Sequence, residues 1–328
     1  MNESLRASCN AFFAQVQNEP RRILHGRGGL YPGCEHLAID WYGPTVLISA
    51  YDAVADEQLL CDALLQADQQ RQIASILLQR RYLKGVPCEA LHGTEVETAV
   101  VTEAGLRYEV HPGVKQNAGL FLDTAPLRQW LRDHSNGLNV LNLFAYTCSF
   151  SIAALAGGAS AVTNVDMSKT SIEWGRRNHA LNGLDRDKVN YVPHNLFRSW
   201  GRIKQSGRYD LVIIDPPTRQ RGSFDAEKNY GAVLKKLPGM THPGAEVIAT
   251  LNSPFLGSDY LMELFREFLP HCEFLESMPV APEFADATPE KALKICRFRM
   301  PGLQLRVPSG TINQYSGSQQ NQAGENHD

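Results

Sequence analysis

The sequence predicts an α/β fold, in which a mostly parallel sheet carries helices on both faces and follows a smaller α+β unit. From about residue 138, short apolar runs alternate with amphipathic stretches, a pattern typical of parallel strands joined by helices. Each apolar run also ends at polar or turn-forming residues. The length of 328 residues agrees, since a domain averages roughly 150 residues.

The N-terminal unit is predicted over residues 1–114. Apolar residues at steps of three and four indicate helices, and alternation of apolar and polar residues indicates strands. In chain order we expect a helix over 1–20, strands at 37–41 and 46–50, a helix over 56–80 and a hairpin over 98–110. Arg27 lies in a glycine-rich loop at 26–29, which we interpret as a plain turn in preference to a phosphate contact.

The larger domain is predicted over residues 115–300, with a polar loop at 216–230. The same patterns predict strands at 138–144, 161–165, 189–192, 209–214, 246–251, 272–278 and 293–299, and helices at 151–156, 169–181, 197–204 and 258–268. Residues 301–328 are rich in Gln, Asn, Ser and Gly, a composition that predicts a disordered tail.

Composition excludes whole classes of protein. No apolar run is long enough for a membrane span and no signal peptide is evident, so we expect a cytoplasmic protein without a membrane partner. The seven cysteines are scattered and never spaced as CxxC, which predicts reduced thiols and no metal site. The net charge of −3 argues against binding to nucleic acid by bulk electrostatics.

The polar strand ends carry the functional signal. Asp166 follows the second strand, 22 residues after Phe144, where an acid grips a ribose diol in nucleotide-binding sheets. The alternative is a helix N-cap. No glycine lies between Leu143 and Ser151, so the phosphate-binding turn of NAD and FAD sites is missing. A nucleoside without phosphate fits better, and S-adenosylmethionine is the first candidate.

The fourth strand ends in Asp215-Pro216-Pro217-Thr218. Prolines fix the backbone and remove N–H donors, so carbonyl and carboxylate oxygens are left as acceptors. Such a group can hold an amine or a flipped base beside a methyl donor. The alternative is a plain turn that ends the strand.

Together these motifs resemble the class I S-adenosylmethionine-dependent methyltransferases. The likeness is strongest to the bacterial 23S rRNA methyltransferases, first the guanine-N7 half of the K/L enzymes and then the cytosine-C5 enzymes. It is carried by residues 117–123, 141–147, 165–168, 178–184 and 214–218. The resemblance implies a Rossmann-like seven-stranded domain over about 115–300, in which the N-terminal unit is only weakly covered.

The resemblance also implies roles for individual residues. The turn at 144–148 would wrap the methionine part of the cofactor, Asp166 would hold its ribose, and Asn195 would meet the adenine. The segment 117–123 would cover the cofactor. The cofactor-binding residues so implied are Asn117, Phe121, Asp123, Phe144, Ala145, Tyr146, Thr147, Asp166, Met167, Asn195 and Asp215, while Asp215, Pro216 and Asn252 would line the acceptor pocket.

The chain departs from the family pattern at four positions. Cys148, Asn195 and Ala125 stand where the family usually has Gly, Asp and Arg. Asn252 follows the fifth strand, where the cytosine-C5 enzymes place a nucleophilic cysteine. Covalent attack by cysteine is needed to activate cytosine C5, whereas a base nitrogen already has a lone pair. We therefore predict methylation at nitrogen.

The partner is predicted from local charge. Residues 198–236 hold nine Lys or Arg against four acids, and we expect Arg219, Arg221 and Lys228 to contact RNA phosphates. A solvated surface is the alternative for this stretch. A methyltransferase for a small molecule or protein, and an inactive cofactor-binding module, also stay open. So does the oligomeric state, with a homodimer among the options.

Overall fold

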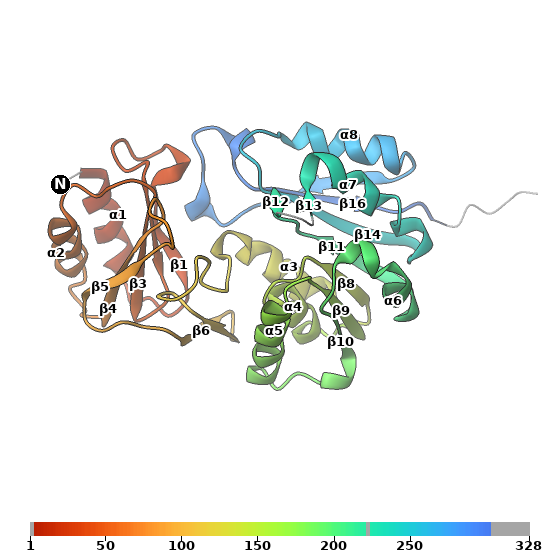
Figure 1. Cartoon of the computed structure of the whole chain (residues 1–328), viewed down its shortest axis with the longest axis horizontal. Helices are drawn as coiled ribbons and strands as arrows, with labels where there is room; N and C mark the ends of the chain where they lie inside the picture. The colour runs from red at the N-terminus through yellow and green to blue at the C-terminus, as the bar shows by residue number, and fades with distance from the viewer. Residues whose placement is uncertain (1–2, 221–223, 303–328) are drawn as a thin grey trace, which may run out of the picture.

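The computed structural model describes residues 3–220 and 224–302. The predicted tail at 301–328 therefore lies almost entirely outside the described residues. The chain forms a five-stranded sheet near its N-terminus and a seven-stranded sheet in its larger part. Figure 1 shows the two sheets in separate units, joined by the segment that carries β6 (Ala99–Glu103) and by a C-terminal segment that returns toward β1 (Arg21–His25).

The N-terminal sheet has the order β1-β2-β3-β4-β5, and only β3 and β4 run parallel. Successive side chains of its central strand, β3, point to opposite faces of the sheet. Val46 and Ile48 pack under the two helices, and Leu47 and Ser49 lie on the other face. The elements are α1 (Glu3–Phe13), β1 (Arg21–His25), β2 (Leu37–Trp41), β3 (Thr45–Ala50), α2 (Glu57–Ala67), β4 (Ser75–Arg80) and β5 (Cys88–His92).

Two helix predictions in this unit are wrong in extent. The first helix ends at Phe13 and the strand β1 follows it, where the sequence predicted helix up to residue 20. The second helix ends at Ala67, and Ser75–Arg80 is a strand. Five of the six residues of β4 are buried, so apolar and polar residues do not alternate along this strand, and its short apolar run at 76–78 would also fit a helix.

The seven-stranded sheet confirms the predicted α/β architecture. Its order is β10-β9-β8-β11-β14-β16-β15, and β16 alone runs against its neighbours. Helices α3 and α4 pack on one face, and α6, α7 and α8 on the other. The strands are β8 (Asn139–Leu143), β9 (Ala161–Val165), β10 (Val189–Val192), β11 (Tyr209–Ile214), β14 (Thr241–Leu251), β15 (Glu273–Ser277) and β16 (Lys294–Arg299).

Two of the helices were not predicted. The helix α3 was not recognised, and α7 begins inside the stretch predicted as a polar loop. A two-residue ladder of β12 (Arg219–Gln220) and β13 (Phe224–Asp225) precedes α7. The helices are α3 (Ala125–His134), α4 (Ser149–Ala156), α5 (Lys169–Leu181), α6 (Trp200–Gln205), α7 (Ala226–Leu234) and α8 (Ser258–Phe268).

The predicted hairpin is present as β6 (Ala99–Glu103) and β7 (Leu106–Val110). It contacts both units: Val101, Tyr108 and Val110 pack with Tyr42 and Leu47 of the N-terminal unit, and other contacts run to the larger unit. Trp174 on α5 donates its indole N–H to the carbonyl of Glu109 at 3.0 Å, and the amide of Glu109 donates to Asn178 Oδ1 at 2.8 Å. The hairpin therefore packs beside α5. The predicted boundary between the two domains, at residues 114 and 115, remains our proposal.

Candidate active site

The predicted strand-end residues meet at one edge of the seven-stranded sheet. Leu143 is paired with both Val165 and Ile214, and Val165 with Val192. The last residues of four parallel strands thus lie side by side, with β14 continuing beyond Ile214. The turns that follow them form one rim, at the carboxyl ends where α/β sheets bind their ligands.

The turn after β8 has an unusual backbone. Phe144, Tyr146 and Cys148 have φ of +61°, +46° and +64°, a region that costs a non-glycine residue roughly 1–2 kcal/mol. Asp166 holds the turn: its Oδ2 accepts from the amide of Tyr146 at 2.9 Å, and its Oδ1 from that of Ser168 at 2.8 Å. Burial raises the pKa of Asp166.

The segment 117–123 is tied to this turn. Thr147 Oγ1 donates to the carbonyl of Gly119 at 2.6 Å, and the Tyr146 hydroxyl donates to that of Asn117 at 3.2 Å. Gly119 has a φ of +107°, and a Cβ there would lie 2.2 Å from the ring of Trp174. The segment approaches the turn so closely because this residue has no side chain.

The segment and the rim each contribute one carboxylate, and the two lie close enough for their charges to interact. Asp123 Oδ1 is buried and has no hydrogen-bond partner in the described part of the chain, and burial raises the pKa of Asp123. Asp215 accepts from the Thr250 hydroxyl. Burial, and then the nearby charge of Asp123, raise the pKa of Asp215 to about 6. An unpartnered buried carboxylate is costly and fits a cationic ligand.

A narrow slot lies between the ends of β9 and β10. It is lined by Phe144, Asp166, Met167, Asn195 and Phe197, and its volume is about 20 Å³. A purine ring enters only if the side-chain walls part. Met167 is 41 % exposed, and its unbranched side chain moves at little cost. The oxygen of the Asn195 side chain accepts from the Phe197 amide at 2.9 Å, which caps the turn that closes the slot.

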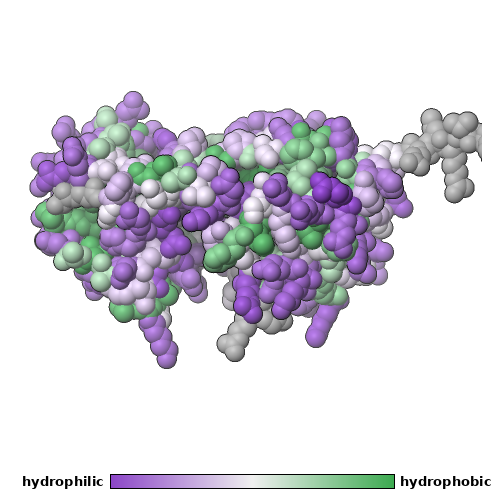
Figure 2. Space-filling view, turned by 90° about the horizontal axis from the view of Figure 1, so that it is seen from above, coloured by the Kyte–Doolittle hydropathy of each residue, from purple (hydrophilic) through white to green (hydrophobic). Residues whose placement is uncertain are grey.

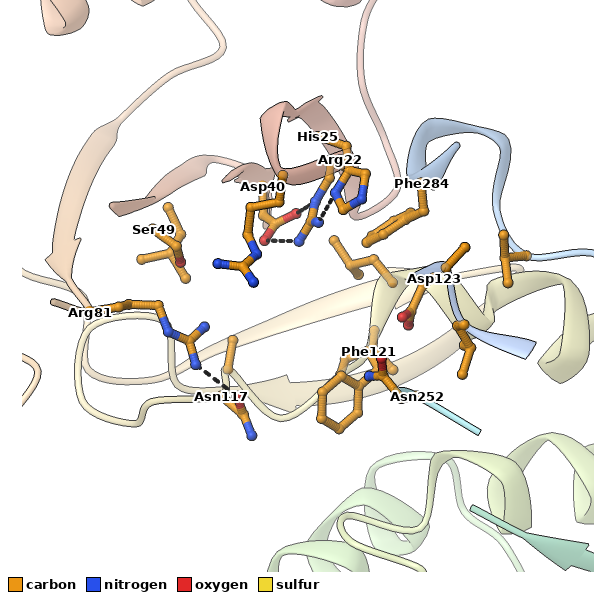
Figure 3. Close-up of a pocket in the computed structure, with 18 of the residues that line it drawn as sticks. Arg22, His25, Asp40, Ser49, Arg81, Asn117, Phe121, Asp123, Asn252 and Phe284 are labelled. Atoms are coloured by element: carbon orange, nitrogen blue, oxygen red, sulfur yellow. Dashed lines mark hydrogen bonds and ion pairs between the residues drawn. The ribbon is translucent and has the colours of Figure 1, made fainter. Parts of the chain in front are cut away.

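A larger cleft of about 420 Å³ opens between the two sheets (Figure 3). Asn117, Phe121, Asp123 and Asn252 line it from the larger unit. The N-terminal sheet supplies the opposite wall with Arg22, His25, Asp40, Ser49 and Arg81, whose roles the sequence did not predict. The space-filling view shows a waist between the smaller unit, on the left, and the larger one (Figure 2).

One ion pair organises the N-terminal wall. Arg22 donates to both carboxylate oxygens of Asp40, at 2.8 and 3.0 Å, and its Cζ lies 4.1 Å from the ring centroid of Phe284. Burial and the charge of Arg22 lower the pKa of His25 to about 4, so this imidazole is neutral at pH 7. The wall is therefore a fixed part of the structure.

The residues predicted to line the acceptor pocket come from two strand ends. Pro216, the residue after Asp215, is buried. Thr218 donates its hydroxyl to the carbonyl of Asn252, which joins the loop after β11 to the loop after β14. Phe255, three residues beyond Asn252, is 89 % exposed. An exposed aromatic ring is a typical platform for a nucleic acid base, and Pro254, the residue before Phe255, lines the cleft.

The basic stretch is only partly described. The side chain of Arg219 is 80 % exposed and lies 3.7 Å from Asp225, and Lys228 is exposed on α7. Arg221 lies outside the described residues. The aromatic residues of the stretch belong to the core: Phe224 and Tyr230 are buried, and the Tyr230 hydroxyl donates to the carbonyl of Thr250 at 3.1 Å.

Residues 3–220 and 224–302 contain neither a metal-binding cluster nor a membrane-spanning helix. No group of three or more His, Cys, Asp or Glu in these ranges is placed to hold a metal ion. No helix in them has the length and apolar character needed to cross a membrane.

The sequence also matches known proteins. Residues 21–299 match the model of an S-adenosylmethionine-dependent methyltransferase family. The chain is 35 % identical over 232 residues to ribosomal RNA large subunit methyltransferase K/L of Shewanella pealeana, and 31 % over 234 residues to that of Hahella chejuensis. Each match covers 66 % of this chain and 32 % of the relative, so the chain spans about a third of these proteins.

Solved structures support the fold. A Streptococcus mutans protein assigned as an S-adenosylmethionine-dependent methyltransferase superimposes with a TM-score of 0.79 at 24 % identity, over 91 % of this chain and 80 % of that one. The M. jannaschii tRNA m1G37 methyltransferase gives a TM-score of 0.58 at 17 % identity, over 82 % and 77 %. At these identities the likeness concerns the fold alone.

Proposed function

The chain belongs to the S-adenosylmethionine-dependent methyltransferase family, and from that premise we propose that it methylates a nitrogen atom of an RNA base without a covalent cysteine intermediate. Ribosomal RNA is the first candidate, because the curated relatives are named for it. This substrate would place the enzyme in the cytoplasm with the ribosomes.

The residues at the rim fit S-adenosylmethionine. The unpartnered oxygen of Asp123 suits a ligand with an ammonium group and a positively charged sulfur. Asp166 has lone pairs left for a ribose diol after accepting two backbone amides. When bound, the cofactor supplies an electrophilic methyl group.

The acceptor residues would position a base edge. Asn252 both donates and accepts hydrogen bonds, so it can read a base. An ionised Asp215 can accept hydrogen bonds but not donate them, and its pKa of about 6 leaves it mostly ionised at pH 7. Orientation of this kind suffices for a nitrogen with a free lone pair. Pro216, whose ring restricts the backbone, would fix the position of its own carbonyl oxygen beside Asn252 and Asp215.

The observation that carries the nitrogen assignment is the state of the cysteines. None of the seven is among the residues that line the cleft. Cys148 is the one nearest the rim, and it is fully buried, with a pKa that burial raises well above its usual value. A nucleophilic cysteine needs an accessible thiolate. Asn252 stands at the cleft instead.

Exposed groups around Asn252 support RNA as the substrate class. Phe255 presents an exposed ring three residues after Asn252. Exposed positive charge comes from Arg219, which follows the Thr218 bonded to the Asn252 carbonyl, and from Lys228 on α7. Stacking and phosphate contact are the two interactions that single-stranded RNA offers to a protein.

The test is to incubate the protein with labelled S-adenosylmethionine and, separately, total RNA, protein and small-molecule fractions from a deletion strain. We expect label in RNA, and mass spectrometry of its nucleosides should find an N-methylated base that the deletion strain lacks. Loss of 5-methylcytidine in that strain would contradict the nitrogen assignment. Label confined to the protein or small-molecule fraction would contradict RNA.

A further inference from the structure

The cleft wall formed by the N-terminal sheet holds two arginines on one aromatic ring. Tyr51 follows β3 and lines the cleft. The Cζ atom of Arg27 lies 3.8 Å from its ring centroid and that of Arg81 lies 5.2 Å from it. A ring attracts a guanidinium group within about 6 Å. Tyr51 therefore holds both cations at the cleft.

Neither arginine is neutralised. In the described part of the chain, Arg27 and Arg81 have no carboxylate within ion-pair distance, although Asp123 and Asp286 line the same cleft. Their neighbours do: Arg22 pairs with Asp40, and Arg80 pairs with Glu57 and Glu89.

Arg81 instead donates to a neutral acceptor, Asn117 Oδ1, at 3.3 Å (Figure 3). This contact directs its guanidinium group toward the segment that covers the cofactor site. Arg27 itself is exposed. Two arginines without an ion-pair partner in the described part of the chain thus line the same cleft as Asn252 and Phe121.

We propose that Arg27 and Arg81, held on Tyr51, bind phosphate groups of the RNA strand next to the acceptor nucleotide. Guanidinium groups match the oxygens of a phosphodiester, and such contacts fix the register of a nucleic acid while other residues read the base. The N-terminal sheet is then the part of the enzyme that positions the RNA. The proposal rests on RNA being the substrate class.

The experiment measures the affinity of the full chain for a single-stranded RNA 20-mer by fluorescence anisotropy, between 50 and 300 mM KCl. The variants are Arg27→Gln, Arg81→Gln and the double variant. Arg6→Gln is the matched control, because Arg6 is an exposed arginine on α1, which packs against the other face of the sheet.

Each cleft variant should bind the RNA about tenfold more weakly than wild type. Each should also reduce the salt slope, d log K/d log[KCl], by about 0.7, the value for one lost phosphate contact on a single strand. Arg6→Gln should change neither quantity. Cleft variants that behave like Arg6→Gln would overturn the proposal.

The tyrosine provides a second, independent variant pair. Tyr51→Phe keeps the ring and should bind as wild type, whereas Tyr51→Leu removes it and should weaken binding like the arginine variants. Equal binding by both would mean that the ring does not hold the cations.

The cofactor also carries an anionic carboxylate, which the two arginines could bind in place of an RNA phosphate. The affinity for S-adenosylhomocysteine, measured by calorimetry, distinguishes these two ligands. We expect it to be unchanged in all variants. A parallel loss would assign the arginines to the cofactor.

The outcomes also separate this site from the proposed function. RNA that is bound through the two arginines but never methylated would contradict the function and keep the site. RNA that is methylated, with binding that the cleft variants leave unchanged, would contradict the site and keep the function.

Discussion

Asp166 combines two roles in one side chain, since it caps two backbone amides and is proposed to hold the ribose. Asp166→Ala should weaken binding of S-adenosylhomocysteine by roughly ten- to a hundredfold, because a hydrogen bond to a charged group is worth about 1.5–3 kcal/mol. Asp166→Asn, which keeps one acceptor oxygen, should lie between the alanine variant and wild type. Calorimetry measures both.

The control is Asp185→Ala, because Asp185 is an exposed aspartate that caps a short turn by accepting from the amide of Asp187 at 3.0 Å. It should lower the melting temperature slightly and leave the affinity unchanged. If Asp166→Ala did the same, Asp166 would be a cap and nothing more.

The buried carboxylate of Asp215 makes stability depend on pH. Its pKa rises from 3.8 to about 6 on folding, so the folded state prefers the protonated form. Asp215 therefore costs no stability below pH 4, an increasing amount between pH 4 and 6, and a constant amount on the order of 2–3 kcal/mol at higher pH. Asp215→Asn should raise the melting temperature at pH 8 and leave it unchanged at pH 4.

The same variant should methylate far more slowly, because the amide has lost the acceptor charge. Asp210→Asn, at the opposite end of β11, is the control for a strand aspartate away from the rim. A melting temperature of Asp215→Asn that equals wild type at both pH values would contradict the pH argument.

At the level of single residues, the sequence predicted which residues lie at the strand ends of the larger sheet. It did not predict which residues of the N-terminal sheet line the cleft. Asp166, Asp215 and Asn252 each follow a parallel strand, and parallel strands bring their ends together whatever the details of packing. Arg22 and Asp40 lie on different antiparallel strands, and only the strand pairing and the docking of the second unit bring them to the cleft. No local pattern encodes that arrangement.

Among the elements, the hairpin β6–β7 depends on one buried ion pair. Arg128 on α3 donates to both oxygens of Glu103, at 2.7 and 2.6 Å, and also to the carbonyl of Phe121 at 2.8 Å. Glu103→Ala leaves this cation buried and unpaired, so it should destabilise the fold by about 3–5 kcal/mol in urea unfolding.

Two further variants test whether the loss of stability comes from the unpaired buried charge. The double variant Glu103→Leu, Arg128→Met should recover most of the loss, because apolar side chains can replace a buried pair. Glu273→Ala breaks an exposed pair with Arg299 and should cost less than about 1 kcal/mol. A single variant as stable as the double one would contradict the argument.

The elements that the sequence failed to predict share physical reasons. The strand β4 is buried over most of its length, so it lacks the alternation that reveals a half-exposed strand. The helix α3 begins with a proline at its first turn and has polar residues on most of its surface. The strand β1 is five residues long, and two of them are arginines.

At the scale of the whole molecule, the junction between the two units depends on Gly28. A Cβ at this position would lie 2.5 Å from the carbonyl oxygen of Ala285, which is backbone and cannot rotate away. The amide of Ala287 also donates to the carbonyl of Gly28 at 2.7 Å. Gly28→Ala should separate the segments and split thermal unfolding into two transitions by calorimetry.

Gly201→Ala is the matched control, since Gly201 lies in α6 and a Cβ there meets nothing within 4 Å. This variant should gain roughly 0.5–1 kcal/mol from helix propensity and unfold as wild type does. A single, unshifted transition for Gly28→Ala would mean that the contact is not needed for docking.

The turn with three left-handed residues has a consequence for the thermodynamics of binding. Asp166 and Thr147 fix the shape of this turn through contacts within the chain. The conformational entropy of the turn is therefore lost during folding, and little ordering remains for the ligand to impose. Substitutions that loosen the turn without touching the ligand should weaken binding of the cofactor. The loss should appear as a less favourable binding entropy, with the binding enthalpy nearly unchanged.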